Sequence, residues 1–300
     1  MKLSVVVPTL NGRDQLESCL DALATHAPGA EVIVVNGPSS DGTTGMVQDR
    51  DDVDVLVELA DRRLNVARNA GIDRASGDVI ALLDHRLTVE SGWLAALADG
   101  IADGDAVTGP THQELEAGLT TESVESRTIK GRTVTYFDGG NAAFTADLLD
   151  EIDGFDEYLH TGGARDAAHR LAALDYEVAW EGGMSVRREY SADGGRAEPD
   201  WRWKYRSLAY RLAKNYGVRP TVLRRLTGHS VRDAVGALKD VARGDADPSS
   251  WFGNGREVLA GLATGLKDGA VARYRDRSPR RNPNGRSKRA DRAVAVYDYR

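Results

Sequence analysis

The stretch LSVVVPTLN, residues 3–11, places a β-branched apolar run directly before a polar turn. Similar short apolar runs follow at residues 31–35, 53–57 and 78–83, and the segments between them are helix-like. In the first of these segments, Leu16, Leu20 and Leu23 have the spacing of one helical face. Strands that alternate with helices predict an α/β chain with a mostly parallel, Rossmann-like sheet flanked by helices.

Three of the predicted strands end in polar turns, which read PTLN at 8–11, NGPSSDGT at 36–43 and DHR at 84–86. Because ligands of parallel sheets bind beyond the carboxyl ends of the strands, we expect these turns to line one crevice. The chain has neither Gly-x-Gly-x-x-Gly after the first strand nor Gly-x-x-x-x-Gly-Lys-Ser/Thr anywhere. Both absences argue against a dinucleotide-dependent dehydrogenase and a P-loop nucleotidase, so a sugar-nucleotide fold is the remaining candidate.

Size and composition predict a globular protein, since 300 residues with 41% hydrophobic content suit one large domain or two closely joined ones. No apolar run approaches the ~20 residues that span a bilayer, and we find no secretory signal. The single cysteine, Cys19, lies among the leucines of the first predicted helix, which excludes disulfides and cysteine metal sites. We therefore expect a cytoplasmic protein.

Charge is unevenly distributed along the chain. The whole sequence has 46 acids and 39 bases, yet residues 201–232 contain nine bases and no acid, and residues 272–300 contain ten bases and three acids. A separation of this kind indicates an anionic partner for the basic segments.

Several motifs occur in one order and spacing: VVVPTLN at 5–11, EVIVVNG at 31–37, SDGT at 40–43, ARNAGI at 67–72, ASGDVIALLD at 75–84, GGNAAF at 139–144 and GFDE at 154–157. Together they resemble the family-2 glycosyltransferases of GT-A fold, over about residues 1–185, and in particular haloarchaeal enzymes of surface-glycoprotein N-glycosylation. The resemblance implies a nucleotide-sugar-binding half at 1–110 and an acceptor-binding half at 111–200. We expect a helical basic extension at 201–276 and a disordered basic tail at 277–300.

The resemblance also implies site residues. Donor-binding residues would be Pro8, Thr9, Asn11, Asn36, Asp41, Arg68 and Asp84, and acceptor-binding residues would be Gly140 and Asn141. The family commonly has Asp at position 36, so the base preference of this chain stays open. The alternatives are that Asn11 and Asp41 only cap a helix and shape a turn, and that Arg68 is a solvated helix residue.

The chain departs from the family at the metal site. Asp84 would be the first acid of the Asp-x-Asp motif that holds a divalent ion, but Arg86 stands at the second position. Arg187 or Arg188 stands where the family often has a metal-binding His. The cofactor is therefore either none or Mg²⁺ or Mn²⁺ held weakly by Asp84, and Arg86 is a candidate catalytic residue that stabilises the departing diphosphate. The alternative is that Arg86 only forms a salt bridge with Asp84 or a neighbouring acid.

A carboxylate must also take the proton of the acceptor hydroxyl. The family places it in a Glu-Asp pair that opens a helix after Gly-Phe-Asp, and in the corresponding stretch, 159–171, Asp166 is the only acid. Asp166 is therefore the candidate catalytic base, or else an ordinary acid of the first helical turn. His169 is the second candidate, and a packing role is the simpler reading for it.

Residues 201–216 predict a basic amphipathic helix with aromatic side chains. Such a helix suits a membrane interface, or its apolar stripe packs inside the protein. The basic tail would add attraction to anionic lipid.

These observations predict an enzyme that passes a sugar from a nucleoside-diphosphate sugar to a lipid-linked phosphate or glycan, with inversion. It would contact the anionic inner face of the cell membrane peripherally. The alternative is a pseudoenzyme that binds sugar nucleotides and scaffolds other transferases. Nucleic-acid binding is disfavoured, because the basic tail lacks interleaved aromatic residues.

Overall fold

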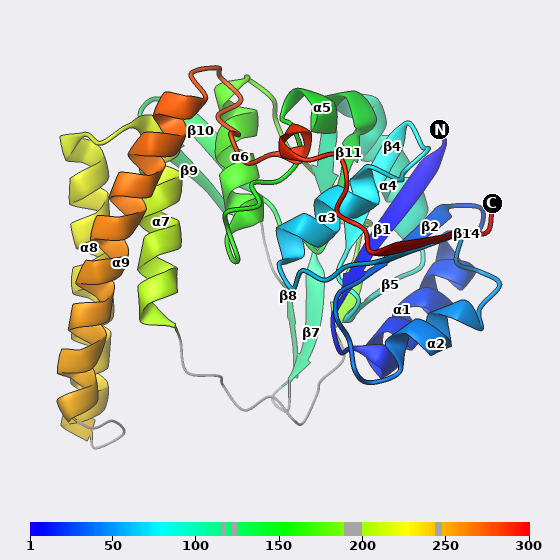
Figure 1. The fold of residues 1–300 in the computed structure, drawn as a ribbon, viewed down its shortest axis with the longest axis horizontal. Coiled ribbons are helices and arrows are strands. Elements are labelled where there is room, and N and C mark those ends of the chain that lie inside the picture. Colours follow the sequence, from blue (N-terminus) through cyan, green and yellow to red (C-terminus); the bar gives the residue numbers. More distant parts are fainter. Residues whose placement is uncertain (116–117, 122–124, 189–199, 244–247) are drawn as a thin grey trace. The chain divides into compact units, whose positions relative to one another are not determined.

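The computed structural model describes residues 1–115, 118–121, 125–188, 200–243 and 248–300. The chain divides into two compact units (Figure 1). One unit comprises Met1–Ala192 with Asn284–Arg300, and the other comprises Asp193–Pro283.

The first unit is built on an eight-stranded sheet with the order β12-β6-β11-β4-β1-β2-β3-β14. Its bounds are β1 Leu3–Thr9, β2 Glu31–Asn36, β3 Val55–Glu58, β4 Val79–Leu83, β6 Ala106–Thr108, β11 Asn141–Thr145, β12 Ala179–Trp180 and β14 Ala295–Asp298. Strands β1 to β4 are parallel, and β11 and β14 are antiparallel to their neighbours β4 and β3. The predicted α/β class and the mostly parallel core of the sheet are confirmed.

Helices cover both faces of this sheet (Figure 1). They are α1 Arg13–His26, α2 Thr43–Gln48, α3 Leu64–Ile72, α4 Trp93–Asp103, α5 Ala146–Glu151 and α6 Gly163–Ala173. Side chains alternate along a strand, so Val5 and Val7 of β1 join the buried leucines of α1 on one face. On the other face Gly71 of α3 lies against Val6, where even a Cβ would come within 2.2 Å of the valine. The close approach of α3 therefore depends on glycine.

A smaller sheet joins β5 Leu87–Val89, β13 Val186–Arg188, β7 Thr111–Leu115 and β8 Gly118–Thr121 in that order. Strands β9 Glu125–Ile129 and β10 Arg132–Tyr136 form a hairpin. The second half of this unit thus mixes parallel and antiparallel pairs, since β7 is parallel to β13 and antiparallel to β8, whereas the first half is a parallel α/β layer.

The C-terminal segment corrects the prediction of a disordered tail for residues 277–300. Residues from Asn284 onward belong to the first unit, with the short 3₁₀ helix Arg286–Lys288 and strand β14, which extends the main sheet beside β3. Arginines of the segment pair with acids of the body: Arg286 with Asp73 at 2.8 Å and Asp150 at 2.5 Å, Arg292 with Asp73 at 2.6 Å and Glu157 at 2.5 Å, and Arg300 with Glu31 at 2.8 Å. The anionic partner of these bases lies within the same chain.

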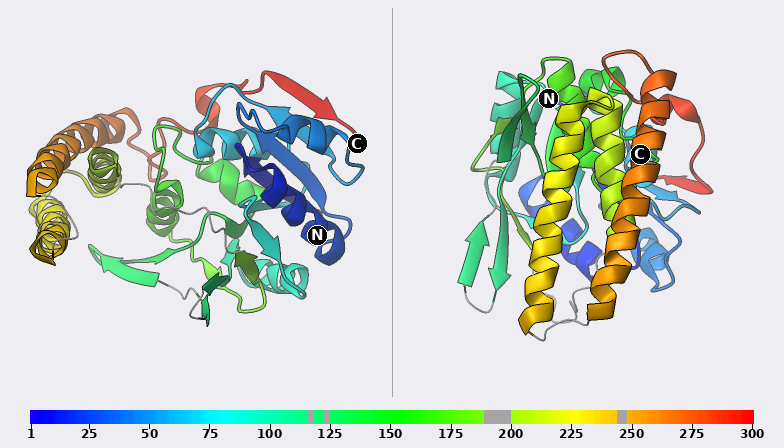
Figure 2. Two further views of the ribbon diagram at one scale, coloured as in Figure 1. Left: turned by 90° about the horizontal axis from the view of Figure 1, so that it is seen from below. Right: turned by 90° about the vertical axis from the view of Figure 1, so that its left-hand side faces the viewer.

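The second unit contains α7 Trp201–Tyr216, α8 Pro220–Arg243 and α9 Pro248–Arg275, which run side by side (Figure 2). Glycines Gly261, Gly265 and Gly269 of α9 face α7, and a Cβ at each would lie 2.3–2.5 Å from a backbone carbonyl of α7. Tyr205, Leu212 and Tyr216 of the predicted apolar stripe are buried. No helix in the described part of the chain is long and apolar enough to cross a membrane.

Candidate active site at the carboxyl ends of the strands

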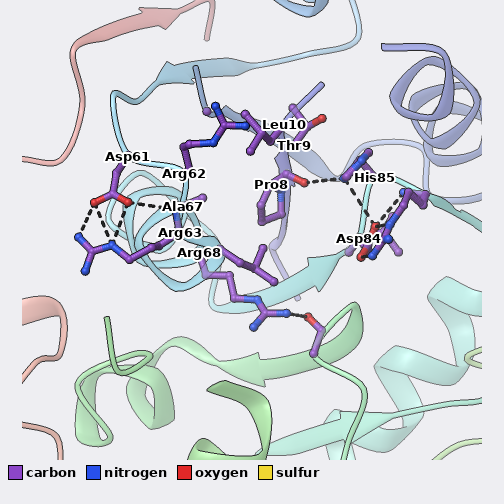
Figure 3. Close-up of a pocket in the computed structure, with 15 residues that line it drawn as sticks. Pro8, Thr9, Leu10, Asp61, Arg62, Arg63, Ala67, Arg68, Asp84 and His85 are labelled. Carbon is purple, nitrogen blue, oxygen red and sulfur yellow. Dashed lines mark hydrogen bonds and ion pairs between the residues drawn. The ribbon is translucent and has the colours of Figure 1, made fainter. Parts of the chain in front are cut away.

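A cavity of about 160 Å³ opens at the carboxyl ends of β1 and β4, beside the start of α3 (Figure 3). Its lining comprises Pro8, Thr9, Leu10, Gly37, Asp61, Arg62, Arg63, Leu64, Ala67, Arg68, Leu83, Asp84, His85, Arg86 and Gly139. Of the residues predicted from the sequence, the structure brings Pro8, Thr9, Arg68, Asp84 and Arg86 together here. The polar turns after β1 and β4 therefore meet as expected.

Arg68 is the buried cation of this cavity. Its side chain is 7% exposed, its Nη2 donates to the carbonyl of Gly139 at 2.7 Å, and its Nη1 donates to Oδ1 of Asn65 at 3.2 Å. Burial lowers the pKa of Arg68 to about 10, although the charges of Asp138 and Asp84 oppose this shift. Because a solvated helix arginine would be exposed, that alternative for Arg68 is wrong.

Two buried polar atoms at the cavity lack partners among the described residues, namely Nε of Arg68 and Oγ1 of Thr9. Thr9 is only 5% exposed. An unpaired buried donor costs about 1–3 kcal/mol, so such atoms mark places where a ligand supplies the missing hydrogen bond. A guanidinium and a hydroxyl together suit phosphate oxygens.

Asp84 and Arg86 form a close pair at the cavity wall. Arg86 donates from Nε to Oδ1 of Asp84 at 2.9 Å and from Nη2 to Oδ2 at 2.6 Å, and its backbone N–H donates to Oδ1 at 3.0 Å. Burial would raise the pKa of Asp84, but the hydrogen bonds and charge of Arg86 outweigh it and lower the pKa to about 2. The structure therefore contains the salt bridge of Arg86 with Asp84 that the alternative predicted. Both residues also line the cavity.

The remaining donor candidates shape the neighbouring loop and do not line the cavity. Asn36 is 1% exposed, donates to Thr44 at 3.0 Å and accepts from Ser39 at 2.7 Å. Oδ1 of Asn11 accepts from the backbone N–H of Ser40 at 2.8 Å. Asp41 accepts from the backbone N–H groups of Arg13 at 3.0 Å and Thr43 at 3.2 Å. These contacts are those expected of turn and cap residues.

The glycine turn of residues 139–140 forms the opposite wall. The carbonyl of Gly140 accepts from the N–H of Asp84 at 2.9 Å, and a Cβ on Gly140 would lie 2.8 Å from Cβ of Asp84. Asn141 is fully buried and binds Trp93 Nε1 at 2.9 Å and the carbonyl of Met184 at 2.8 Å. Gly140 thus permits the close approach of two strand ends, and the side chain of Asn141 links β11 to α4 and to the loop before β13.

The predicted base, Asp166, lies in the first turn of α6 and is 0% exposed. Nε of Arg170 donates to its Oδ2 at 3.0 Å, and Arg170 also binds the carbonyl of Gly154 at 2.8 Å. His169 is 3% exposed and packs edge-on against Tyr136 with ring centroids 5.5 Å apart. Neither Asp166 nor His169 lines the cavity. Their contacts therefore favour the alternatives, in which Asp166 is an ordinary acid of the first helical turn and His169 is a packing residue.

Arginines at the end of β13 behave differently from each other. Arg187 pairs with Glu90 at 2.7 Å, whereas Nε of Arg188 is buried without a partner among the described residues. In the sheet register Arg188 lies opposite Leu87, the residue that follows Arg86 in the sequence.

Sequence reasoning missed the segment at 61–64, which supplies four residues of the lining. Within it Arg63 pairs with Asp61 at 2.5 Å, and Arg62 is exposed. The available signal was the run of two arginines, Arg62 and Arg63, directly before α3.

Comparison with known proteins agrees with this geometry. The sequence profile described as "Glycosyl transferase family 2" matches residues 4–153. Glycosyltransferase AglE of Haloferax volcanii is 26% identical over 59% of this chain and 64% of its own length. A GalNAc(5)-diNAcBac-PP-undecaprenol beta-1,3-glucosyltransferase of Campylobacter jejuni is 34% identical over 40% of this chain and 41% of its own length. The matched regions thus span less than two thirds of either relative.

Two solved structures share the fold. Mannosyltransferase PcManGT of Pyrobaculum calidifontis, in complex with GDP-Man and Mn²⁺, has a TM-score of 0.57 at 20% identity, over 92% of this chain and 88% of that one. TarS of S. aureus, in complex with UDP-GlcNAc, has a TM-score of 0.62 at 16% identity, over 96% of this chain and 90% of that one. These likenesses establish the GT-A architecture. Because the family profile covers residues 4–153, half of the 300, the chain belongs to glycosyl transferase family 2.

Proposed function

We propose that this protein is a glycosyltransferase that takes a sugar from a nucleoside-diphosphate sugar bound at the strand-end cavity. The observation that carries the proposal is the buried Arg68, which lines a cavity at the carboxyl ends of parallel strands and whose Nε has no partner among the described residues. Arg68 and Arg86 would hold the diphosphate, and Thr9 would add a hydroxyl donor. A guanidinium stays charged at any working pH and stabilises the negative charge that develops on the leaving diphosphate.

The donor set at Asp84 does not fit a divalent ion. Both carboxylate oxygens already accept hydrogen bonds from Arg86, and the described residues contain no group of three His, Cys, Asp or Glu that could hold a metal. A hard cation prefers several oxygen ligands and would have to displace the Arg86 guanidinium from Asp84. We therefore propose that the leaving group is stabilised by arginine. PcManGT, in contrast, is in complex with Mn²⁺.

We further propose a lipid-linked acceptor, reached at an anionic membrane surface, and transfer with inversion. Support for the acceptor is that the name of the C. jejuni relative includes an undecaprenol-linked glycan. The relatives are named as glycosyltransferases, so the comparisons give no support to the pseudoenzyme alternative.

The membrane-contacting element that the charges favour is α8, and not α7 as the sequence suggests. On α7, Lys204 pairs with Asp233 at 2.6 Å and Arg206 with Asp268 at 3.0 Å, and the stripe residue Tyr205 is buried. The bases of α7 thus serve contacts within the helical unit.

Helix α8 exposes an apolar stripe of Leu223, Val231, Val235 and Leu238, each 41–60% accessible. Arg224, Arg225, Arg232 and Lys239 flank this stripe, and none of them has an ion pair within the described residues. An exposed apolar stripe bordered by unpaired cations suits the interface of an anionic bilayer. Beside it a cavity of about 330 Å³, lined by Trp201, Val231, Val258 and Leu259 among others, offers apolar space for a lipid chain.

The donor proposal is tested by calorimetric titration of the whole chain with UDP-GlcNAc, UDP-Glc and GDP-Man, followed by measurement of nucleoside diphosphate release. We expect one nucleotide to bind, and Arg68→Gln to weaken it by ~10- to 100-fold, because a charge-assisted hydrogen bond contributes about 1.5–3 kcal/mol. Arg132→Gln, which removes an exposed arginine of β10, is the matched control. Equal affinity of wild type and Arg68→Gln would refute the assignment of Arg68, and no binding of any nucleotide would refute the proposal.

A further inference from the structure

Asp138 is a half-buried carboxylate beside the cavity that no motif singled out. Oδ1 accepts from the backbone N–H of Gly140 at 2.9 Å, and Oδ2 accepts from Oγ1 of Thr111 at 3.2 Å. Both donors are neutral, so they orient the carboxylate without neutralising its charge. Asp138 directly precedes Gly139, which lines the cavity and accepts the hydrogen bond from Arg68.

Other acids near the cavity are already matched with cations. Asp84 is paired with Arg86, Asp61 with Arg63, and Asp166 with Arg170. Asp138 has no ion pair with any described residue, although it lies close enough to Arg68 and Arg86 for its charge to favour the protonated form of both guanidinium groups. It is therefore a carboxylate with its negative charge still available at the site.

The start of the neighbouring helix α6 brings no exposed carboxylate to the glycine turn. A Cβ on Gly139 would lie 2.9 Å from Cβ of Ala164, so the first turn of α6 reaches the glycine turn with a methyl group. The acid that follows in α6, Asp166, is 0% exposed. Any base that acts at this wall of the cavity must come from elsewhere, and Asp138 is next to it.

We propose that Asp138 is the general base of sugar transfer, an inference that rests on the proposed glycosyltransferase function. The acceptor O–H would give its proton to a carboxylate oxygen of Asp138 as the acceptor oxygen forms a bond to the anomeric carbon of the donor. The bond from that carbon to the diphosphate oxygen breaks, and its electron pair leaves with the nucleoside diphosphate. Arg68 and Arg86 stabilise the resulting negative charge.

The test uses Asp138→Asn and Asp138→Glu in the full chain, with the donor that releases most nucleoside diphosphate from wild type in water, where water is the acceptor. Asn preserves the shape but cannot take a proton, so we expect turnover at saturating donor to fall ~10²- to 10⁴-fold. The dissociation constant of the donor should change less than ~3-fold, and Glu, which keeps the carboxylate, should retain more turnover than Asn. Asp147→Asn, at an exposed position of α5, is the control and should match wild type.

Two results would overturn the inference. One is an Asp138→Asn protein with wild-type turnover. The other is weaker donor binding with undiminished turnover at saturation, which would make Asp138 a residue that recognises sugar hydroxyls. Failure of the donor proposal itself shows earlier and differently, as absence of nucleotide binding and release by wild type.

Discussion

Arg86 donates two side-chain hydrogen bonds, at 2.9 Å and 2.6 Å, to the carboxylate of Asp84, which lies two residues earlier in the chain. Asp84 is 18% exposed and Arg86 is 55% exposed. The carboxylate is thus occupied from the protein side, while the guanidinium still reaches solvent at the cavity wall. Under the proposed function, this fixed cation would do the work of a metal ion at the leaving diphosphate.

Activity should therefore persist in chelator. We expect wild-type release of nucleoside diphosphate to change less than ~2-fold in EDTA, because arginine supplies the stabilising charge. Arg86→Asp removes that charge and adds a second acid, so its turnover should fall ~10²-fold or become dependent on Mg²⁺ or Mn²⁺. Wild-type activity that disappears in EDTA and returns with Mn²⁺ would contradict this interpretation.

Removal of the Asp166 carboxylate should act on stability. Asp166→Asn leaves the buried Arg170 with one neutral partner in place of a carboxylate, and breaking a buried pair costs about 3–5 kcal/mol. We expect a melting temperature lower by roughly 6–12 °C, with turnover per folded molecule unchanged at a temperature where the variant is folded. A normal melting temperature combined with lost turnover would instead restore Asp166 as the catalytic base.

Membrane binding should depend on α8. In flotation with vesicles that contain anionic lipid, replacement of Arg224, Arg225 and Arg232 by Gln should lower binding ~10²-fold, at about 1 kcal/mol per base near the surface. The matched variant replaces Arg202, Lys204 and Arg206 of α7, and we expect it to retain most binding, since Lys204 and Arg206 pair within the unit. High salt should weaken the vesicle binding of both variants. Equal flotation of the two variants would argue against α8.

Acid should loosen the attachment of the C-terminal strand. Glu31 accepts from Ser76 Oγ at 2.6 Å and from Arg300 at 2.8 Å, and it also accepts from Ser4. Burial would raise its pKa, but these hydrogen bonds lower it from 4.5 to about 2. Because the folded-state pKa is depressed, the stabilisation is complete above about pH 4.5 and is lost as the pH falls toward 2.

Glu31→Gln should therefore be less stable than wild type at pH 7 by about 1 kcal/mol, a value reduced by solvent screening, and the difference should shrink between pH 4.5 and pH 3. Urea unfolding at several pH values measures it, with Glu17→Gln on the exposed face of α1 as the control. A difference that stays constant down to pH 3 would show that the pairs of Glu31 contribute nothing to acid sensitivity.

Local patterns in the sequence determined the α/β layer and part of the site. The continuous β-branched run of β1 and the helical spacing of Leu16, Leu20 and Leu23 need no distant contact to be recognised, since each is the pattern of a single buried strand or helix face. The position of Thr9 and Asp84 at strand ends also follows from the sequence, because parallel strands bring their carboxyl ends to one edge.

Only the tertiary structure decided which charged side chains pair with one another. Opposite charges far apart in sequence, such as Arg300 and Glu31, have no local signature, so a basic tail looks disordered until the fold brings acids beside it. The same holds for the bases of α7, which pair within the helical unit, whereas those of α8 have no ion pair among the described residues. It holds most of all for Asp138, because a carboxylate becomes available for chemistry only when its neighbours fail to neutralise it, and those neighbours come from α3, the strand ends and β7. Hydrophobic periodicity is a property of one segment, whereas the electrostatic state of a side chain is set by every segment that the fold places around it.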